Sequence, residues 1–395
     1  MKAIIAGAGI AGLTAAYELG RMGWDVTVLE RAKELRSGGY MIDFFGPGYD
    51  AAEENGLLDG LACRAHAIDG VELVNGDGSH QAYMSYAALR ASLGGRLFSL
   101  MRGDIEQVLF EALPGSVALR FGSEVIAVED RDTGVAVVLD DGTGAEADLL
   151  IGADGLHSGL RRQMFCGEAE ALKFLGYHTA AYIFRSQAVA EAAKGNFTML
   201  SLPGRQAGIF RMQGDQVAVY FLWRDARPER AADTRQAIAE QFGDLGWLIP
   251  EILAGAPENA DIYYDVVAQI EAEHWHGKRT VLIGDAAYAV SLLAGQGASL
   301  AIGGAHLLAR MLAEHDDIGA ALVAFERVMR PEAEKKQAAG RRTAEWIVPS
   351  SRFRVWLRAI VFNFSSLPIV SRLIGGLVPP SPKGIFAGAT KGQHT

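Results

Sequence analysis

The sequence contains little cysteine and no metal-binding pattern. Only Cys63 and Cys166 occur among 395 residues, and neither belongs to a CxxC or a mixed Cys/His spacing. This scarcity excludes a disulfide scaffold and argues against a structural zinc site, so we expect no metal centre. Two unpaired cysteines fit a reducing compartment, and we therefore expect a cytoplasmic protein.

The sequence also lacks an excess of positive charge. The formal net charge of −10 argues against nucleic acid as a partner, because phosphate binding needs a basic surface. The apolar residues 2–6 lead directly into a glycine loop without a cleavage-site pattern, which predicts a strand and no signal peptide. We also find no Ser/His/Asp arrangement that would indicate nucleophilic catalysis.

Glycine, in contrast, is abundant, with 47 residues, and its first cluster is informative. The segment Gly7-Ala8-Gly9-Ile10-Ala11-Gly12 follows a predicted strand and precedes a predicted helix over about 13–23 and a second strand over 26–29. This context makes the fingerprint one of dinucleotide binding. Gly7 would permit the tight turn, Gly9 the approach of a pyrophosphate, and Gly12 close packing of helix and strand.

Glu30 ends the second predicted strand of this unit. Its carboxylate lies at the right distance to accept hydrogen bonds from adenosine ribose hydroxyls. An acid here disfavours a 2′-phosphate, so the site should hold FAD or NAD rather than NADP. The positive end of the helix would face the phosphates.

Two further glycine motifs follow buried strands later in the chain. Residues 149–153 precede Asp154-Gly155, and residues 281–283 precede Gly284-Asp285, which is followed by Gly295-Gln296-Gly297. Three such segments in this order predict a single flavin site.

The length and the pattern of elements predict an α/β protein with two domains. We expect a helix over 102–113, strands over 117–119, 124–128 and 134–139, aromatic-rich strands over 173–184, 197–202, 208–212 and 216–223, and helices over 235–242 and 299–312. The predicted organisation is a Rossmann-like FAD-binding domain (1–72, 98–165 and 276–344), an inserted antiparallel β-sheet substrate domain (73–97 and 166–275) and a C-terminal helical segment (345–395).

The inserted sheet should supply the substrate pocket. The candidates are Phe210, Arg211, Tyr220 and Leu222, and alternation along 216–223 does not reveal which face points inward. Arg211 has two interpretations, a partner for an anion or a solvated edge residue. We interpret His157 and His178 as structural.

These motifs resemble those of the FAD-dependent aromatic hydroxylases, the class A flavoprotein monooxygenases typified by p-hydroxybenzoate hydroxylase. Residues 38–43 and 284–304 are most similar to the branch that contains tetracycline-inactivating and natural-product monooxygenases. The resemblance implies a set of cofactor-binding residues: Gly7, Gly9, Ile10, Ala11, Gly12, Glu30, Arg31, Gly39, Arg102, Asp154, Arg161, Gly284, Asp285, Gly295, Gly297 and Ala298. It also implies a flavin-positioning loop formed by Gly295, Gln296, Gly297, Ala298 and Ser299.

The same resemblance implies a reaction. NADPH or NADH would reduce FAD, the reduced flavin would capture O₂ as a C4a-hydroperoxide, and one oxygen would pass to a bulky, apolar, aromatic or polyketide-like small molecule. Three positions depart from the family pattern. Tyr288 stands where histidine is common, Ser291-Leu292 where proline is common, and Ser299 where asparagine is common.

Alternative functions remain open. A flavin-dependent reductase of a hydrophobic substrate shares these motifs, and so does a flavoprotein that binds a ligand without turnover. A halogenase is disfavoured because Trp247-Leu248-Ile249-Pro250 lacks the first tryptophan and the spacing of the halogenase signature.

The C-terminal segment combines aromatic residues with Arg352, Arg354, Arg358, Arg372, Lys383 and Lys391, and no acidic residue follows Glu345. The arginines interrupt any run long enough to span a bilayer. Contact with a membrane surface is one interpretation, and a helix docked on the FAD domain and bridging to the substrate domain is the favoured one. The sequence does not indicate an oligomeric state.

Overall fold

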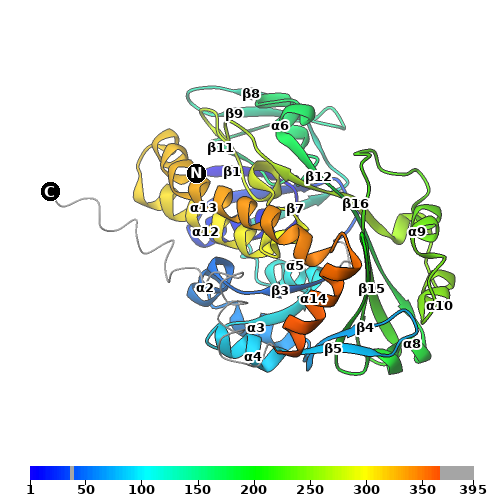
Figure 1. The fold of residues 1–395 in the computed structure, drawn as a ribbon. Coiled ribbons are helices and arrows are strands. Elements are labelled where there is room, and N and C mark those ends of the chain that lie inside the picture. Colours follow the sequence, from blue (N-terminus) through cyan, green and yellow to red (C-terminus); the bar gives the residue numbers. More distant parts are fainter. Residues whose placement is uncertain (36–39, 365–395) are drawn as a thin grey trace.

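A computed structural model describes residues 1–35 and 40–364, and two β-sheets organise it (Figure 1). The first is a parallel sheet with the order β17-β11-β1-β2-β7, formed by Thr280–Leu282, Leu149–Gly152, Lys2–Ala6, Asp25–Glu30 and Val117–Phe121. Its central strands are continuous apolar runs, as expected for strands covered on both faces. Helix α1 (Ile10–Arg21) crosses from β1 to β2 and packs against α5 (Arg102–Glu111) and α12 (Gly297–Glu314).

The second sheet has seven strands in the order β16-β12-β15-β14-β13-β4-β5. They are Tyr263–Ile270, Leu172–Arg185, Gln216–Arg224, Arg205–Arg211, Phe197–Leu202, Gly70–Val74 and His80–Ser85. Every neighbouring pair is antiparallel except β13 and β4, which run parallel. The predicted division between residues 72 and 73 therefore cuts β4, whose residues 71–74 pair with β13.

The two faces of this sheet have different partners. Val217, Val219, Phe221 and Trp223 of β15 join a core with residues of α8 (Gln187–Ala193), α9 (Thr234–Phe242) and α10 (Ile249–Ala254). The alternate residues, among them Tyr220 and Leu222, face the opposite way. The structure thus settles the orientation that alternation alone left open.

The remaining elements connect these sheets or cover them. A two-stranded sheet pairs β3 (Met41–Phe44) with β6 (Phe98–Met101), and a three-stranded sheet joins β8 (Val125–Asp130), β9 (Val135–Leu139) and β10 (Gly144–Ala147). The other helices are α2 (Pro47–Glu54), α3 (Leu58–Arg64), α4 (Tyr86–Ser92), α6 (Gly159–Met164), α7 (Glu168–Ala171), α11 (Asp285–Tyr288), α13 (Ile318–Ile347) and α14 (Arg352–Asn363), with 3₁₀ turns at Asn259–Asp261 and Leu292–Ala294.

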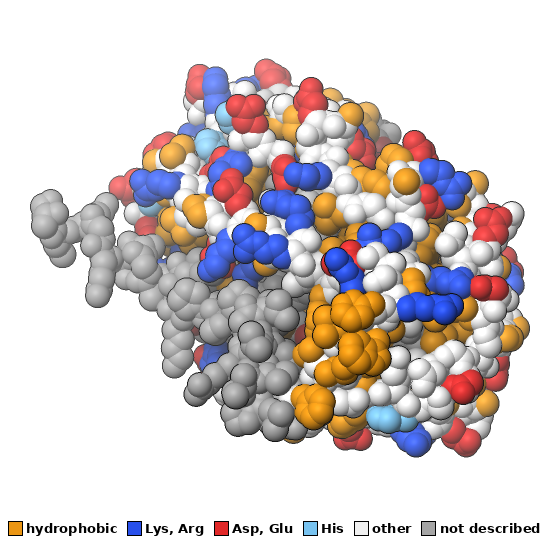
Figure 2. Space-filling view, viewed as in Figure 1, with side chains coloured by type: hydrophobic (Ala, Val, Ile, Leu, Met, Phe, Trp, Pro, Cys, Tyr) orange, Lys and Arg blue, Asp and Glu red, His pale blue; other side chains and the backbone are white. Residues whose placement is uncertain are grey.

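Helix α14 packs on strands β5 and β13 of the seven-stranded sheet (Figure 1), and its Ala359 and Phe362 join a cluster with Ile68, Met41 and Phe45 of the predicted FAD-binding range 1–72. Its inner face includes Val355, Ala359 and Phe362, which are buried. Its outer face exposes Phe353 and Trp356. In Figure 2 a hydrophobic patch lies over the position of α14, near the centre of the view. Arg372, Lys383 and Lys391 of the predicted basic segment lie outside the described residues. None of the described helices is both long and apolar enough to cross a membrane.

Candidate flavin cleft and adjoining cavity

The first glycine motif forms a tight turn that only glycine fits. Gly7 adopts φ +107°, and a Cβ at this position would lie 2.4 Å from the carbonyl oxygen of Ala153. A Cβ on Gly12 would lie 1.9 Å from the Gly7 oxygen. Helix α1 starts with Gly9 as its N-cap, and no described side chain caps it. Its first amide groups therefore remain available for a phosphate.

Glu30 stabilises this turn through two hydrogen bonds. One carboxylate oxygen accepts a hydrogen bond from the Ala8 N–H and the other from the Ala32 N–H, both at 2.8 Å. Each oxygen retains a further lone pair for a ribose hydroxyl. The neighbouring Arg31 extends into solvent, with its closest acid, Glu124, at 3.9 Å.

Arg102 lies opposite the phosphate turn. Its Nη2 forms an ion pair with Glu106 at 2.9 Å, and the same nitrogen lies 3.7 Å from where a Cβ on Gly9 would stand. Burial acts to lower the pKa of Arg102, but the electrostatic effects of Glu106, Tyr40, Tyr263 and Asp285 together outweigh it and raise the pKa. The guanidinium is therefore a fixed cation beside the cleft.

Arg161 of the middle motif connects two parts of the chain. Arg161 is completely buried and donates hydrogen bonds to the carbonyl oxygens of Leu156 (2.7 Å) and Ala286 (2.8 Å). It therefore ties the middle motif to the third motif and has no surface left for a cofactor. Asp154 accepts a hydrogen bond from the Leu160 N–H at 3.0 Å, while its Oδ1 is buried without a partner among the described residues.

The third motif approaches the first closely. Gly284 has φ +60°, and a Cβ there would lie 2.7 Å from the Cβ of Ala11. The next residue, Asp285, keeps its side chain open to the cleft. Loss of solvation by the surrounding protein raises the pKa of Asp285, and the positive charge of Arg102 opposes that rise. Its carboxylate oxygens are free to accept hydroxyl groups such as those of ribitol.

Tyr288, which replaces the usual histidine, points into the core and away from the cleft. Its ring contacts that of Trp275 with centroids 4.9 Å apart. Its hydroxyl fits because residue 304 of α12 is glycine, where a Cβ would lie 2.0 Å from that oxygen. The replacement therefore changes packing behind the cleft, not the groups that line it.

The loop over 291–299 departs more strongly from regular backbone. Ser291 has φ 74° and ψ 157°, a region that residues other than glycine rarely adopt, and Gly295 is left-handed. Helix α12 begins at Gly297 with no side-chain cap in the described chain, so its N-terminal amides can stabilise negative charge. The Gln296 side chain is 4% exposed, and neither amide atom has a hydrogen-bond partner among the described residues.

Ser299 serves to anchor a neighbouring helix. Its hydroxyl accepts a hydrogen bond from the Gly48 N–H at 2.9 Å, and a Cβ on Gly48 would lie 2.6 Å from the Ser299 Cα. The contact fixes α2 against the start of α12. Ala298 lies in the first turn of α12 and is half-buried. Gly39 lies outside the described residues.

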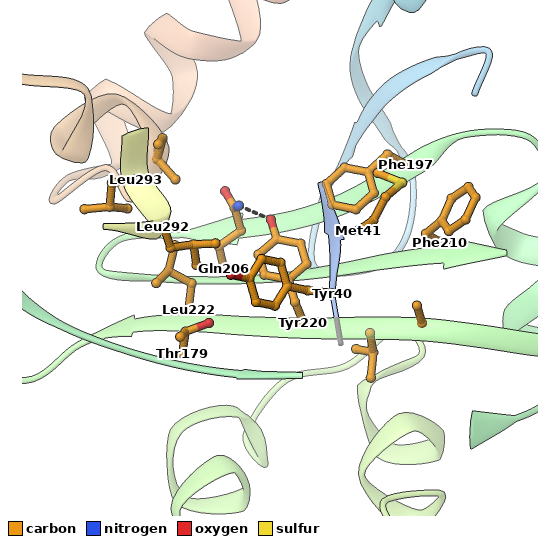
Figure 3. Close-up of a pocket in the computed structure, with 13 residues that line it drawn as sticks. Tyr40, Met41, Thr179, Phe197, Gln206, Phe210, Tyr220, Leu222, Leu292 and Leu293 are labelled. Atoms are coloured by element: carbon orange, nitrogen blue, oxygen red, sulfur yellow. Dashed lines mark hydrogen bonds between the residues drawn. The ribbon is translucent and has the colours of Figure 1, made fainter. Parts of the chain in front are cut away.

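An apolar cavity adjoins the cleft, with about 670 Å³ of space including the part open to solvent. Leu292 and Leu293 line one end of it, and Phe197, Met41 and Phe210 line the other (Figure 3). The remaining lining residues are Tyr40, Thr179, Gln206, Ala218, Val219, Tyr220, Leu222 and Ile347. Its size and mainly apolar walls suit a small organic molecule.

The cavity joins the cleft through two segments. Tyr40 lines the cavity and interacts electrostatically with Arg102 and Asp285 of the cleft. Leu292 and Leu293 belong to the same loop as Gly295 and Gln296. A flavin held in the cleft would therefore be next to the cavity.

Three of the four predicted substrate residues, Phe210, Tyr220 and Leu222, line this cavity. Arg211 does not, because its side chain is exposed at the end of β14 and donates to the Gly214 carbonyl oxygen at 3.2 Å. Its second interpretation, a solvated edge residue, is the one the structure shows. Sequence reasoning missed Gln206 and Ile347 in particular. A polar residue inside an apolar strand is the signal that could have singled out Gln206.

The two histidines interpreted as structural both hold elements together. His157 bonds to Glu168 (2.6 Å) and to Asp265 of β16 (3.0 Å). His178 bonds to the Tyr264 hydroxyl and the Arg227 carbonyl oxygen, both at 2.8 Å.

The residues of the cleft fit a flavin dinucleotide. The uncapped start of α1, the remaining lone pairs of Glu30, the exposed carboxylate of Asp285 and the unpartnered amide of Gln296 lie on segments that the structure brings together, because Gly284 packs against Ala11 and α12 packs against α1. Each offers the hydrogen-bonding group that one part of FAD requires.

Comparison with known proteins agrees with this geometry. A family model described as FAD binding domain matches residues 1–317. FAD-dependent monooxygenase asL4 of Sarocladium schorii is 31% identical over 330 residues, which cover 80% of this chain and 76% of that protein. An uncharacterized protein of Mycobacterium tuberculosis, Rv1260, is 33% identical over 320 residues, 78% of this chain and 83% of its own.

Solved structures share the fold over nearly the whole chain. Tetracycline destructase Tet(55) superposes with a TM-score of 0.81 at 25% identity, covering 96% of this chain and 97% of that one. HpxO of Klebsiella pneumoniae, solved with FAD and uric acid, gives a TM-score of 0.78 at 22% identity and covers 95% of each chain. The second likeness is one of fold alone.

Proposed function

Because this chain belongs to the FAD-binding-domain family of flavin-dependent monooxygenases, we propose that it uses NADPH or NADH and O₂ to hydroxylate a bulky apolar small molecule, aromatic or polyketide-like. The observation that carries the proposal is the junction of cleft and cavity. The loop over 291–299 contributes Leu292 and Leu293 to the cavity and the free amides of α12 to the cleft.

The protein groups would bind and orient both molecules. The N-terminus of α1 and Arg102 would hold the phosphates, Glu30 the adenosine ribose and Asp285 the ribitol. The N-terminal amides of α12 would stabilise negative charge on the flavin pyrimidine. FAD, when bound, supplies the electron transfer and the activation of oxygen.

The cavity would orient the substrate and exclude water. Its walls are mostly aliphatic and aromatic, which favours an apolar ring system. Apolar walls also exclude water and so suppress side reactions of reactive intermediates. No side-chain nucleophile is required for this reaction.

The test is to purify the yellow protein, reduce it with NADPH or NADH without oxygen, and screen aromatic compounds under ¹⁸O₂. We expect bleaching of the flavin and one ¹⁸O atom in the product. Product formed without O₂ would establish the reductase alternative. Flavin that neither pyridine nucleotide reduces, with every compound tried, would indicate a ligand-binding flavoprotein and refute the proposal.

A further inference from the structure

Arg358 is a buried cation whose hydrogen-bonding capacity is only partly used. It lies on the inner face of α14 and is 2% exposed. Its Nη1 donates to Gln206 Oε1 at 3.0 Å and to the carbonyl oxygens of Ile347 and Trp346 at 2.8 and 3.3 Å. Its Nε and Nη2 are buried and have no hydrogen-bond partner among the described residues.

No Asp or Glu side chain compensates this charge. Within residues 1–35 and 40–364, no Asp or Glu oxygen forms an ion pair with Arg358, and the segments 36–39 and 365–395 contain no Asp or Glu at all. Burial lowers the pKa of Arg358 to about 10, which still leaves the group charged at neutral pH. A buried charge without a partner destabilises a protein, so a function is the expected reason for keeping it.

A purely structural role explains only part of this arrangement. The carbonyl oxygens of Trp346 and Ile347 belong to the C-terminal end of α13, where helices attract cations. This contact accounts for Nη1. It leaves Nη2 and Nε, two of the three guanidinium nitrogens, without a role.

The charge lies next to a polar part of the cavity wall, between its two apolar ends. Gln206 and Ile347, which both bond to Arg358, also line the cavity. The amide nitrogen of Gln206 in turn donates to the Tyr220 hydroxyl (Figure 3). The positive charge is thus one hydrogen bond away from the polar groups of the wall.

We propose that the cavity takes an organic anion, an apolar ring compound with one resonance-stabilised oxyanion such as a carboxylate or an ionised enol. The oxyanion would lie at Gln206 and Tyr220, with Arg358 as its counter-charge. This inference rests on the proposed function, because it names the substrate class of the same site.

Two matched pairs of ligands test the inference. They are 1-hydroxy-2-naphthoate with its primary amide, and 2-hydroxy-1,4-naphthoquinone with its methyl ether. Within each pair only one member is an anion near neutral pH. Calorimetric titration of the protein with oxidised FAD bound, and without pyridine nucleotide, measures binding without turnover.

We expect the wild-type protein to bind at least one anion about tenfold or more tightly than its neutral partner, the scale of a hydrogen bond to a charged group. Arg358→Met should abolish that preference. Gln206→Glu should abolish it as well, because the new carboxylate would pair with Arg358. Arg352→Met, on the exposed side of the same helix, should preserve the preference and is the matched control.

Equal affinity within both pairs, no binding of either anion, or a preference that survives Arg358→Met would overturn the proposal. Thermal unfolding of the ligand-free variants shows that each is folded. Because Arg358→Met also removes the hydrogen bonds to the carbonyl oxygens of Trp346 and Ile347, the anion preference and not the Tm decides the role of Arg358. An anion preference that depends on Arg358 in a protein that hydroxylates nothing would refute the proposed reaction and leave this inference standing.

Discussion

The contact between Tyr288 and Gly304 predicts a strong dependence of one residue on the other. A Cβ introduced by Gly304→Ala would lie 2.0 Å from the Tyr288 hydroxyl oxygen, so the two groups cannot both keep their places. The ring cannot move easily because it is buried against Trp275. Overpacking of this kind costs about 1–3 kcal/mol, of which the better helix propensity of alanine recovers up to about 1 kcal/mol.

Tyr288→Phe should relieve most of the conflict. The hydroxyl is buried without a hydrogen-bond partner in the described part of the chain, so its loss should leave the free energy of unfolding equal or raise it by about 1 kcal/mol. In the phenylalanine background the nearest ring atom would still be 3.1 Å from the new Cβ. We therefore expect the penalty of Gly304→Ala to shrink by about 1–2 kcal/mol without vanishing.

The assay is a double-mutant cycle with the four holoproteins in urea, following the release of flavin by its fluorescence. The coupling free energy is the quantity of interest, because it cancels effects that each substitution has on its own. Additive effects of the two substitutions would refute the packing that we describe for Tyr288.

Three further outcomes can be measured. Gly12→Ala should abolish retention of FAD, read as the ratio of flavin to protein absorbance, whereas Gly76→Ala, with open space around it, should retain the cofactor. The pKa of His157 is raised chiefly by its hydrogen bond to Asp265. The stabilisation from this histidine is therefore complete below its ordinary pKa of about 6.5 and is lost as the pH rises through the raised pKa. His157→Gln should flatten the decline of stability between these two pH values in thermal unfolding. Gln296→Leu should stabilise the cofactor-free protein, because it removes a buried amide without partners, and weaken FAD binding by about tenfold in a flavin titration.

Local features of the sequence predicted the glycine turn after the first strand. The roles of Gly7 and Gly12 follow from short-range sterics, which leave glycine as the only residue that fits. Strand β13 has the bounds expected for it, 197–202, because its apolar run is short and clearly limited.

Long-range features could not be predicted in the same way. Which face of β15 points inward depends on the positions of α8 to α10, and the alternation of side chains is identical in either case. The sequence of the motif that contains Arg161 allows the guanidinium to point at a ligand or at backbone carbonyl groups. Only the folded structure shows which of these groups it contacts. The cavity brings together Tyr40, Leu292 and Ile347, which no local pattern connects.

Arg358 did leave a signal in the sequence. Val355, Arg358, Ala359 and Phe362 follow the i, i+3, i+4, i+7 spacing of a buried helix face, and one of the four is charged. The general excess of arginine around it is compatible both with contact with a membrane surface and with a docked helix, which is the favoured interpretation. A charged residue within an apolar stripe is the more specific observation.

The order of strands in the parallel sheet has a consequence for the synthesis of the protein on the ribosome. The central strand β1 is made first, yet one of its two neighbours, β11, follows some 146 residues later, and β17 beyond it is completed only at residue 282. At a synthesis rate of 5–20 residues per second, roughly 14 to 55 seconds pass between the synthesis of β1 and that of Asp285. The cofactor therefore meets a chain that is already three-quarters synthesised, and the nascent N-terminal strands must be shielded from other chains until then.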